Sequence, residues 1–251
     1  MGMPELSSPM LLAIALTFLT AGLVKGVTGM GLPTVAMAVL GALISPLAAA
    51  SLLVVPSFVT NVWQFLDGSA RAAVLRRLWP MMVAIFAGTA LSAGLLVAGE
   101  TGATTTALGL ALVAYAAYSL FARQMHVPVR LEPWLSPFIG GTTGLVTGGT
   151  GILVIPAVPY LQALGLPREH LIQALGLSFT VSTLALATGL GTRGAFTLQG
   201  VGVSALAVLP ALVGMWAGKK LRTRIDPSVF RQLFLVSLLL LGLEMALRPF
   251  W

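Results

Sequence analysis

The longest uncharged stretch of the chain decides its fold. Residues 26–66 read GVTGMGLPTVAMAVLGALISPLAAASLLVVPSFVTNVWQFL, without one Asp, Glu, Lys, Arg or His. As one helix these 41 residues would reach about 61 Å, at ~1.5 Å per residue, whereas the hydrocarbon core of a bilayer is ~30 Å thick. The stretch must therefore turn back, and Ser45–Pro46 is the expected corner because proline disfavours helix in the residue before it.

The composition extends this conclusion to the whole chain. Only 8% of the 251 residues are charged and 57% are hydrophobic, whereas an ordinary soluble domain carries roughly a quarter charged residues. Further uncharged runs are 78–99, 101–122, 133–167, 171–192 and 194–218. None shows the alternating pattern of a barrel strand. The sequence therefore predicts an all-α polytopic membrane protein in contact with the lipid bilayer.

Two segments of the chain repeat each other. Residues 22–29, GLVKGVTG, match residues 144–151, GLVTGGTG, and residues 80–88 match residues 210–218 more weakly. We expect two halves, residues 1–127 and 128–251, within one integrated membrane domain. Each half begins with a short helical hairpin, either re-entrant or fully spanning, followed by three transmembrane helices. The hairpins are expected at 10–26 with 31–44 and at 134–147 with 151–165, and the longer helices at 46–66, 78–98, 101–122, 168–188, 198–217 and 228–248.

The basic residues indicate that the halves have opposite orientations. The loop after the first long helix of the first half holds Arg71, Arg76 and Arg77, whereas the equivalent loop of the second half holds only Arg193. In the next loop the bias is reversed, because the second half carries Lys219, Lys220, Arg222, Arg224 and Arg231. By the positive-inside rule these loops are cytoplasmic, so the halves are predicted to be inverted repeats. Basic loops of this kind explain the net charge of +7 without nucleic acid, and we expect no nucleic-acid partner.

The two glycine-rich turns are the candidate substrate site. Inverted repeats are a recurrent plan of secondary transporters, with the substrate held between the repeats near the membrane midplane. Re-entrant hairpins would bring the turns together there. A helix beginning at Gly31–Leu32, with Pro33 in its first turn, and another at Gly151–Ile152 would point their N-termini at an anion. The candidate residues in the turns are Gly26, Thr28, Gly29, Gly31, Thr147, Gly148, Gly149, Thr150 and Gly151. The alternative is that these glycines only allow close packing of membrane helices.

Three further polar residues complete the predicted site. Lys25 lies inside the first motif with apolar sequence on both sides, and an intramembrane ionisable residue is a functional hypothesis by default. Its alternative role is to reach the cytoplasmic interface from the end of a spanning helix. Asn61 and Gln64 lie on the first long helix and contact either the substrate or other helices.

At these motifs the chain resembles the sulfite exporter TauE/SafE family, also called the toluene sulfonate uptake permease family. The resemblance rests on the two Gly-Leu-Val-x-Gly-x-x-Gly segments and on residues 56–64, PSFVTNVWQ, and it extends from about residue 10 to 248. It implies transport of sulfite, organosulfonates or related small organic anions across the bacterial inner membrane.

The predicted function is a secondary transporter that moves such an anion by alternating access. Export is the favoured direction, because a cytoplasm negative by 100 mV favours exit of each negative charge by about 2.3 kcal/mol. An anion channel and a non-transporting assembly subunit are the alternatives. The only histidines, His126 and His170, are both expected in loops, and no acidic pair lies within a membrane segment. We therefore expect no catalytic residues, metal or cofactor.

Overall fold

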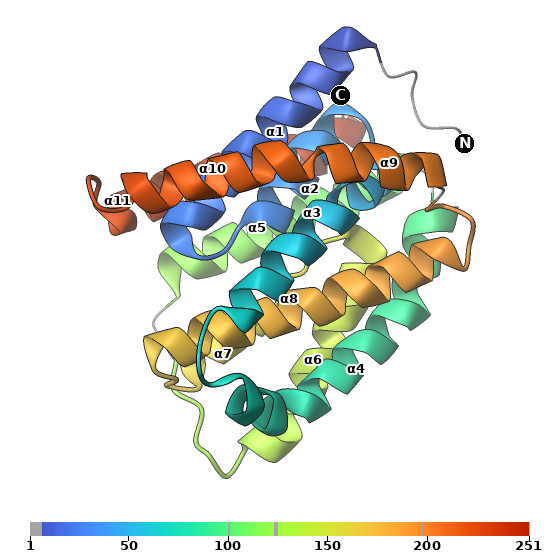
Figure 1. Cartoon of the computed structure of the whole chain (residues 1–251). Coiled ribbons are helices and arrows are strands. Elements are labelled where there is room, and N and C mark those ends of the chain that lie inside the picture. Colours follow the sequence, from blue (N-terminus) through green and yellow to red (C-terminus); the bar gives the residue numbers. More distant parts are fainter. Residues whose placement is uncertain (1–6, 100, 123–124, 197, 251) are drawn as a thin grey trace.

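The structure is a computed structural model that describes residues 7–99, 101–122, 125–196 and 198–250. These residues form helices without any strand (Figure 1). The helices are α1 (Ser8–Thr28), α2 (Leu32–Leu43), α3 (Pro46–Leu66), α4 (Arg71–Ala98), α5 (Thr101–Phe121), α6 (Glu132–Thr150), α7 (Ala157–Ala163), α8 (Arg168–Gly191), α9 (Leu198–Leu206), α10 (Val208–Leu221) and α11 (Pro227–Leu247), and a short 3-10 turn follows at Arg248–Phe250. Within the described ranges, seven helical spans are long and apolar enough to cross a membrane. The prediction of an all-α polytopic membrane protein is confirmed.

The predicted corner at Ser45–Pro46 is present. The Ser45 hydroxyl accepts a hydrogen bond from the Ala48 N–H at 3.2 Å, so this serine caps α3, and Pro46 occupies the first turn. Proline fits there because its missing N–H would have no helical partner in any case.

Both glycine-rich turns end a helix in the same way. Gly29, with φ 81°, follows α1 and its N–H donates to the Lys25 carbonyl at 2.8 Å. Gly151, with φ 76°, follows α6 and its N–H donates to the Thr147 carbonyl at 2.7 Å. Only glycine adopts this left-handed conformation readily, which explains why the repeated motif ends in glycine.

One expectation about a helix is wrong. No helix begins at Gly151–Ile152, because residues 151–156 are not helical and α7 is only seven residues long. Pro156 disfavours a helical conformation at the preceding residue, Ile155. The segment is also rich in β-branched residues, which lowers its helix propensity. The membrane helix expected at 198–217 is present as the span Gly200–Leu221. A single non-helical residue, Ala207, divides it into α9 and α10, because Pro210 has no N–H to donate to the Leu206 carbonyl.

The glycines of the repeated motifs bring helices of different halves into backbone contact. α1 packs against α10, and α6 packs against α4. A Cβ atom at Gly26 would overlap the Met215 carbonyl oxygen, and one at Gly144 would overlap the Ile85 carbonyl oxygen. For these glycines the close-packing alternative therefore holds. The halves are interleaved, and their relation as inverted repeats stays a prediction.

The two turns have different neighbours along α4. Gly29 lies beside Gly68 and Lys219, at the end where α4 begins, and we call this the basic end. Gly149 lies 3.9 Å, measured from an ideal Cβ, from Leu95 near the other end of α4. At ~1.5 Å per residue the 12-residue α2 covers about 18 Å, less than the ~30 Å hydrocarbon core, so a re-entrant first hairpin stays a prediction.

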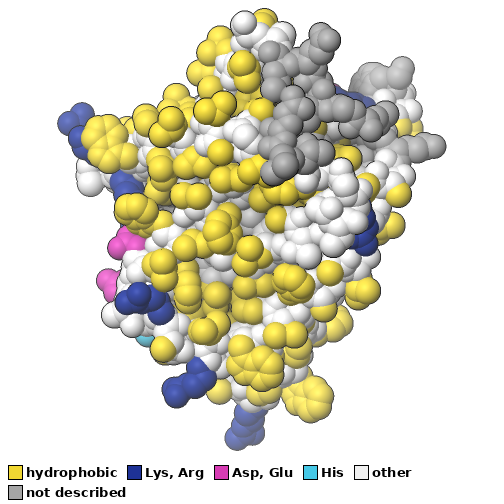
Figure 2. All heavy atoms as spheres, turned by 45° about the vertical axis from the view of Figure 1, so that its right-hand side comes forward, with side chains coloured by type: hydrophobic (Ala, Val, Ile, Leu, Met, Phe, Trp, Pro, Cys, Tyr) yellow, Lys and Arg dark blue, Asp and Glu magenta, His cyan; other side chains and the backbone are white. Residues whose placement is uncertain are grey.

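The outer surface suits a lipid environment. Figure 2 shows hydrophobic side chains over the whole width of one face, with acidic side chains and most of the visible basic ones toward its edges. Large apolar side chains such as Leu91, Leu95 and Trp134 are among the most exposed. Exposure of this kind is expected for helices that face lipid rather than water.

Candidate anion site

Lys25 is a cationic residue buried between helices. It lies in the last turn of α1, and only 3% of its surface is exposed. Its ammonium donates a hydrogen bond to the Thr60 hydroxyl at 3.2 Å and another to the Asn61 side-chain oxygen. Both partners belong to α3 and both are neutral.

The local sequence explains where Lys25 points. Gly22 and Gly26 turn toward α10, where each meets backbone. Lys25 precedes Gly26 by one residue, about 100° around the helix, so its side chain leaves the α10 contact and faces α3. The glycine motif thus sets the lysine against a different helix from the one that the glycines touch.

A chain of buried side chains fixes the Asn61 amide. Its nitrogen donates to the Ser57 hydroxyl at 2.9 Å, and Ser57 shares a 3.0 Å hydrogen bond with Thr183 of α8. Thr183 in turn donates to the Phe179 carbonyl at 2.6 Å. Because the amide nitrogen is occupied by Ser57, the amide oxygen is the group left to face Lys25.

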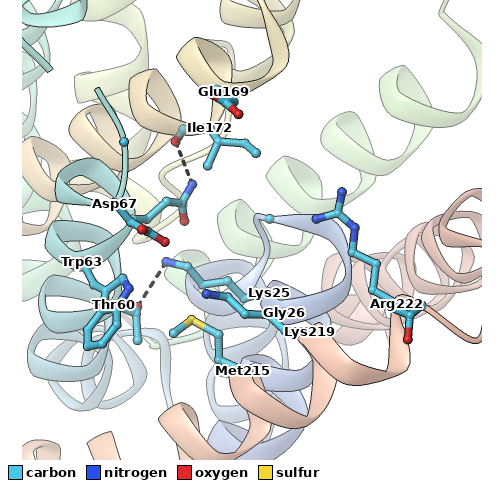
Figure 3. Close-up of a pocket in the computed structure, with 14 residues that line it drawn as sticks. Lys25, Gly26, Thr60, Trp63, Asp67, Glu169, Ile172, Met215, Lys219 and Arg222 are labelled. Atoms are coloured by element: carbon cyan, nitrogen blue, oxygen red, sulfur yellow. Dashed lines mark hydrogen bonds between the residues drawn. The ribbon is translucent and has the colours of Figure 1, made fainter. Parts of the chain in front are cut away.

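A cavity of about 610 Å³ reaches Lys25 from the basic end (Figure 3). It is lined by Lys25 and Gly26 of α1, by Gly29 after that helix, by Thr60, Trp63 and Gln64 of α3, by Asp67 and Gly68, by Glu169 and Ile172 of α8, by Met215 and Lys219 of α10, and by Arg222 and Thr223. Three of these side chains are cationic and two are anionic. Lys219, Asp67 and Thr223 are exposed, whereas Lys25 is buried.

Lys25 forms no ion pair with the carboxylates of the cavity. The ion pairs among the described residues are Arg77–Glu132 and Arg248–Glu244, and Lys25 belongs to neither. A buried charge with only neutral partners is costly, and an anion in the cavity would offset that cost. The site therefore suits a small negatively charged ligand.

The family model for "Sulfite exporter TauE/SafE" matches residues 14–245. The chain belongs to the sulfite exporter TauE/SafE family. No curated protein and no solved structure matches it. Members of the family are membrane transporters, and the chain is a multi-pass protein of the inner membrane.

The structure places one group of the predicted site residues at this cavity of the TauE/SafE fold. Lys25, Gly26, Gly29 and Gln64 line it, and Asn61 contacts Lys25. Gln64 is held by its amide nitrogen, which donates to the Ile172 carbonyl at 2.9 Å.

Two residues of the first turn serve the turn itself. The Thr28 hydroxyl donates to the carbonyls of Val24 and Met30, at 2.9 and 2.7 Å. Gly31 is the residue before α2, where an added Cβ would meet Val24. Neither residue lines the cavity.

The predicted residues of the second half form the second glycine-rich turn, outside the cavity. Thr147 donates to the Ile152 carbonyl at 2.9 Å, and Thr150 donates to the Val146 carbonyl at 2.7 Å. The remaining members of this group are glycines 148, 149 and 151, of which Gly148 packs against α4 and Gly151 against Met37 of α2. None of the five lines the cavity around Lys25.

Sequence reasoning did not assign Lys219, Arg222, Glu169 or Asp67 to the site. Lys219 and Arg222 were read only as topology signals, although they stand at the mouth of the cavity. The spacing of four residues between glycines 214 and 218, like that between glycines 22 and 26, could have indicated that α10 packs on α1. That pairing alone would have placed Lys219 beside Gly26.

Proposed function

We propose that this protein is a secondary transporter that carries a small anion, namely sulfite, an organosulfonate or a related organic anion, out of the cell by alternating access. The observation that carries the proposal is the buried ammonium of Lys25, whose hydrogen-bond partners are all neutral, at the wall of a cavity. Membership of the sulfite exporter family supports the same class of substrate.

Lys25 has the capacity to bind an anion without releasing its present partners. An ammonium has three N–H groups, and the two hydrogen bonds to Thr60 and Asn61 leave one for a ligand oxygen. The exposed Lys219 and the half-buried Arg222 lie nearer the mouth and would attract the anion toward Lys25.

The basic end supports export as the direction of transport. Arg71, Arg76 and Arg77 begin α4 at this end, and Lys219 and Lys220 end α10 there, so the positive-inside rule assigns it to the cytoplasm. The cavity then receives the anion from the cytoplasm. The membrane potential favours the outward movement of a negative charge by about 2.3 kcal/mol per 100 mV.

Alternating access requires that the site be closed toward the other side. Close packing around the second turn supports such a closed state, because a Cβ at Gly148 would overlap Thr89 and Ser92 of α4, and one at Gly151 would overlap Met37 of α2. We further propose that residues 1–127 and 128–251 are inverted repeats, and that movement of one repeat against the other opens the site to the outer side.

Flux through liposomes containing the purified protein tests this function and separates it from a channel. Vesicles loaded with sulfite, and parallel vesicles loaded with toluenesulfonate, should release the anion at a rate that saturates with its concentration. The rate should increase when the compartment that faces the basic end is made negative. Release at the rate of protein-free vesicles would contradict transport of these anions, and single-channel currents would favour the channel.

A further inference from the structure

A proline inside the continuous helix α3 leaves a break in its backbone hydrogen bonds, immediately before the anion site. Pro56 lies in the interior of the helix and is buried. Because proline has no N–H, the Leu52 carbonyl loses the helical partner that residue 56 would otherwise supply. In a membrane such a carbonyl needs another donor.

Ser204 of α9 supplies that donor from the other half of the chain. Its hydroxyl donates to the Leu52 carbonyl at 2.7 Å and accepts a hydrogen bond from the Val55 N–H at 3.1 Å. The side chain is fully buried. Ser204 therefore satisfies one acceptor and one donor of the interrupted helix at once, 152 and 149 residues away in the chain.

The part of α3 that follows the break carries the side chains that hold Lys25. Ser57, Thr60 and Asn61 lie within its first two turns. Thr60 also donates to the Pro56 carbonyl at 2.8 Å, so the break and the site share a hydrogen bond. A change in direction at Pro56 would move Thr60 and Asn61 relative to Lys25.

From these contacts we infer that Ser204 is a positioning residue for the anion site: it holds the break of α3 at Pro56 in the geometry that sets Thr60 and Asn61 against Lys25. This inference rests on the proposed function, because it assigns Ser204 to the same site. It also gives α9 a role, which is to connect the second half of the chain to the break.

The variants Ser204→Ala and Pro56→Ala test whether Ser204 positions the anion site or only provides a hydrogen-bond partner for the α3 backbone. Ser204→Ala leaves the Leu52 carbonyl unpaired, and it should lower the thermal midpoint and raise the KM for sulfite about tenfold. Pro56→Ala restores the helical N–H, so the double variant Pro56→Ala/Ser204→Ala should regain the thermal midpoint. If the break positions the site, the double variant should still transport sulfite poorly. A double variant with the KM and maximal rate of the original chain would show that Ser204 only repairs the helix, and would overturn the inference.

A labelling measurement tests the same point even if sulfite is not the substrate. The chain has no cysteine, so Gln64→Cys provides a single thiol at the cavity wall. Its reaction rate with a charged methanethiosulfonate should change several-fold in both the Ser204→Ala and Pro56→Ala backgrounds. Ser237→Ala is the matched control, because the exposed Ser237 hydroxyl donates only to the Leu233 carbonyl of its own helix. Equal rates in all backgrounds would contradict the inference, whereas failed sulfite flux by the original chain would contradict only the proposed substrate.

Discussion

Lys25 and Asn61 are joined by a hydrogen bond between α1 and α3, 36 residues apart in the chain. The amide oxygen faces the ammonium because the amide nitrogen donates to Ser57. A neutral amide therefore occupies the place where a carboxylate would neutralise the lysine. This arrangement keeps the positive charge of Lys25 available to a ligand, and it leads to a prediction about charge alone.

Asn61→Asp should weaken anion binding strongly while the protein remains folded. The carboxylate has nearly the shape of the amide but would pair with Lys25, and an anion would then face a neutralised site. We expect sulfite affinity, measured by calorimetry, to fall about a hundredfold, the change expected from loss of a charge-assisted hydrogen bond. Gln64→Glu is the control, because Gln64 lines the same cavity without a hydrogen bond to Lys25. Equal losses in the two variants would contradict a specific role for Asn61.

The orientation of the ends can be checked with single cysteines. Ser69 and Thr223 are exposed at the basic end, and Thr192 is exposed beyond α8 at the opposite end. In whole cells, a membrane-impermeant maleimide should label Thr192→Cys but neither Ser69→Cys nor Thr223→Cys, which should react only after the membrane is opened. Labelling of Ser69→Cys and Thr223→Cys from different sides would disprove the inverted topology.

Two neighbouring glycines of α6 should respond differently to alanine. A Cβ at Gly144 would overlap the Ile85 carbonyl oxygen, whereas nothing lies within 4 Å of a Cβ at Gly141. Gly144→Ala should cost about 1–3 kcal/mol of stability through overpacking. Gly141→Ala should be neutral or stabilise the helix by up to about 1 kcal/mol. Thermal unfolding in detergent measures both, and similar midpoints for the two variants would contradict the packing of α6 on α4.

Local chemistry made part of the fold predictable. The corner at Ser45–Pro46 and the glycine turns at Gly29 and Gly151 follow from proline and from left-handed glycine, which act within a few residues. The extended segment before Pro156 was missed, because its apolar composition is equally compatible with a short helix.

The site was predictable only in part because it is assembled across distant helices. Lys25 stood out as a charge in an apolar motif, and Asn61 as an amide in a membrane helix. Their contact depends on how α1 packs against α10 and α3, and no local sequence pattern predicts that packing. Glu169 and Arg222 join them only through that packing. The expected meeting of the two turns depends on re-entrant hairpins and stays a prediction.

The ion pair between Arg77 and Glu132 should stabilise the contact of α4 with α6. It is bidentate, at 2.6 and 2.8 Å, and the glutamate side chain is only 11% exposed. Glu132→Gln should cost about 1–2 kcal/mol, since it leaves the arginine without its partner in a partly buried place. The exposed pair of Arg248 with Glu244 is the control, and Glu244→Gln should cost less than about 0.5 kcal/mol. Equal shifts of the thermal midpoint would contradict this ranking.

Sulfite affinity of the Lys25→Met variant tests the central claim most directly. Methionine keeps most of the side-chain stem and removes the ammonium, so calorimetry should show a loss of about tenfold to a hundredfold. Lys25→Arg should retain part of the affinity, although its planar group has a different shape. Lys219→Met, which removes an exposed charge from the mouth of the same cavity, should change the affinity less than about threefold. Affinity unchanged in Lys25→Met, with the protein folded, would show that Lys25 does not bind the anion.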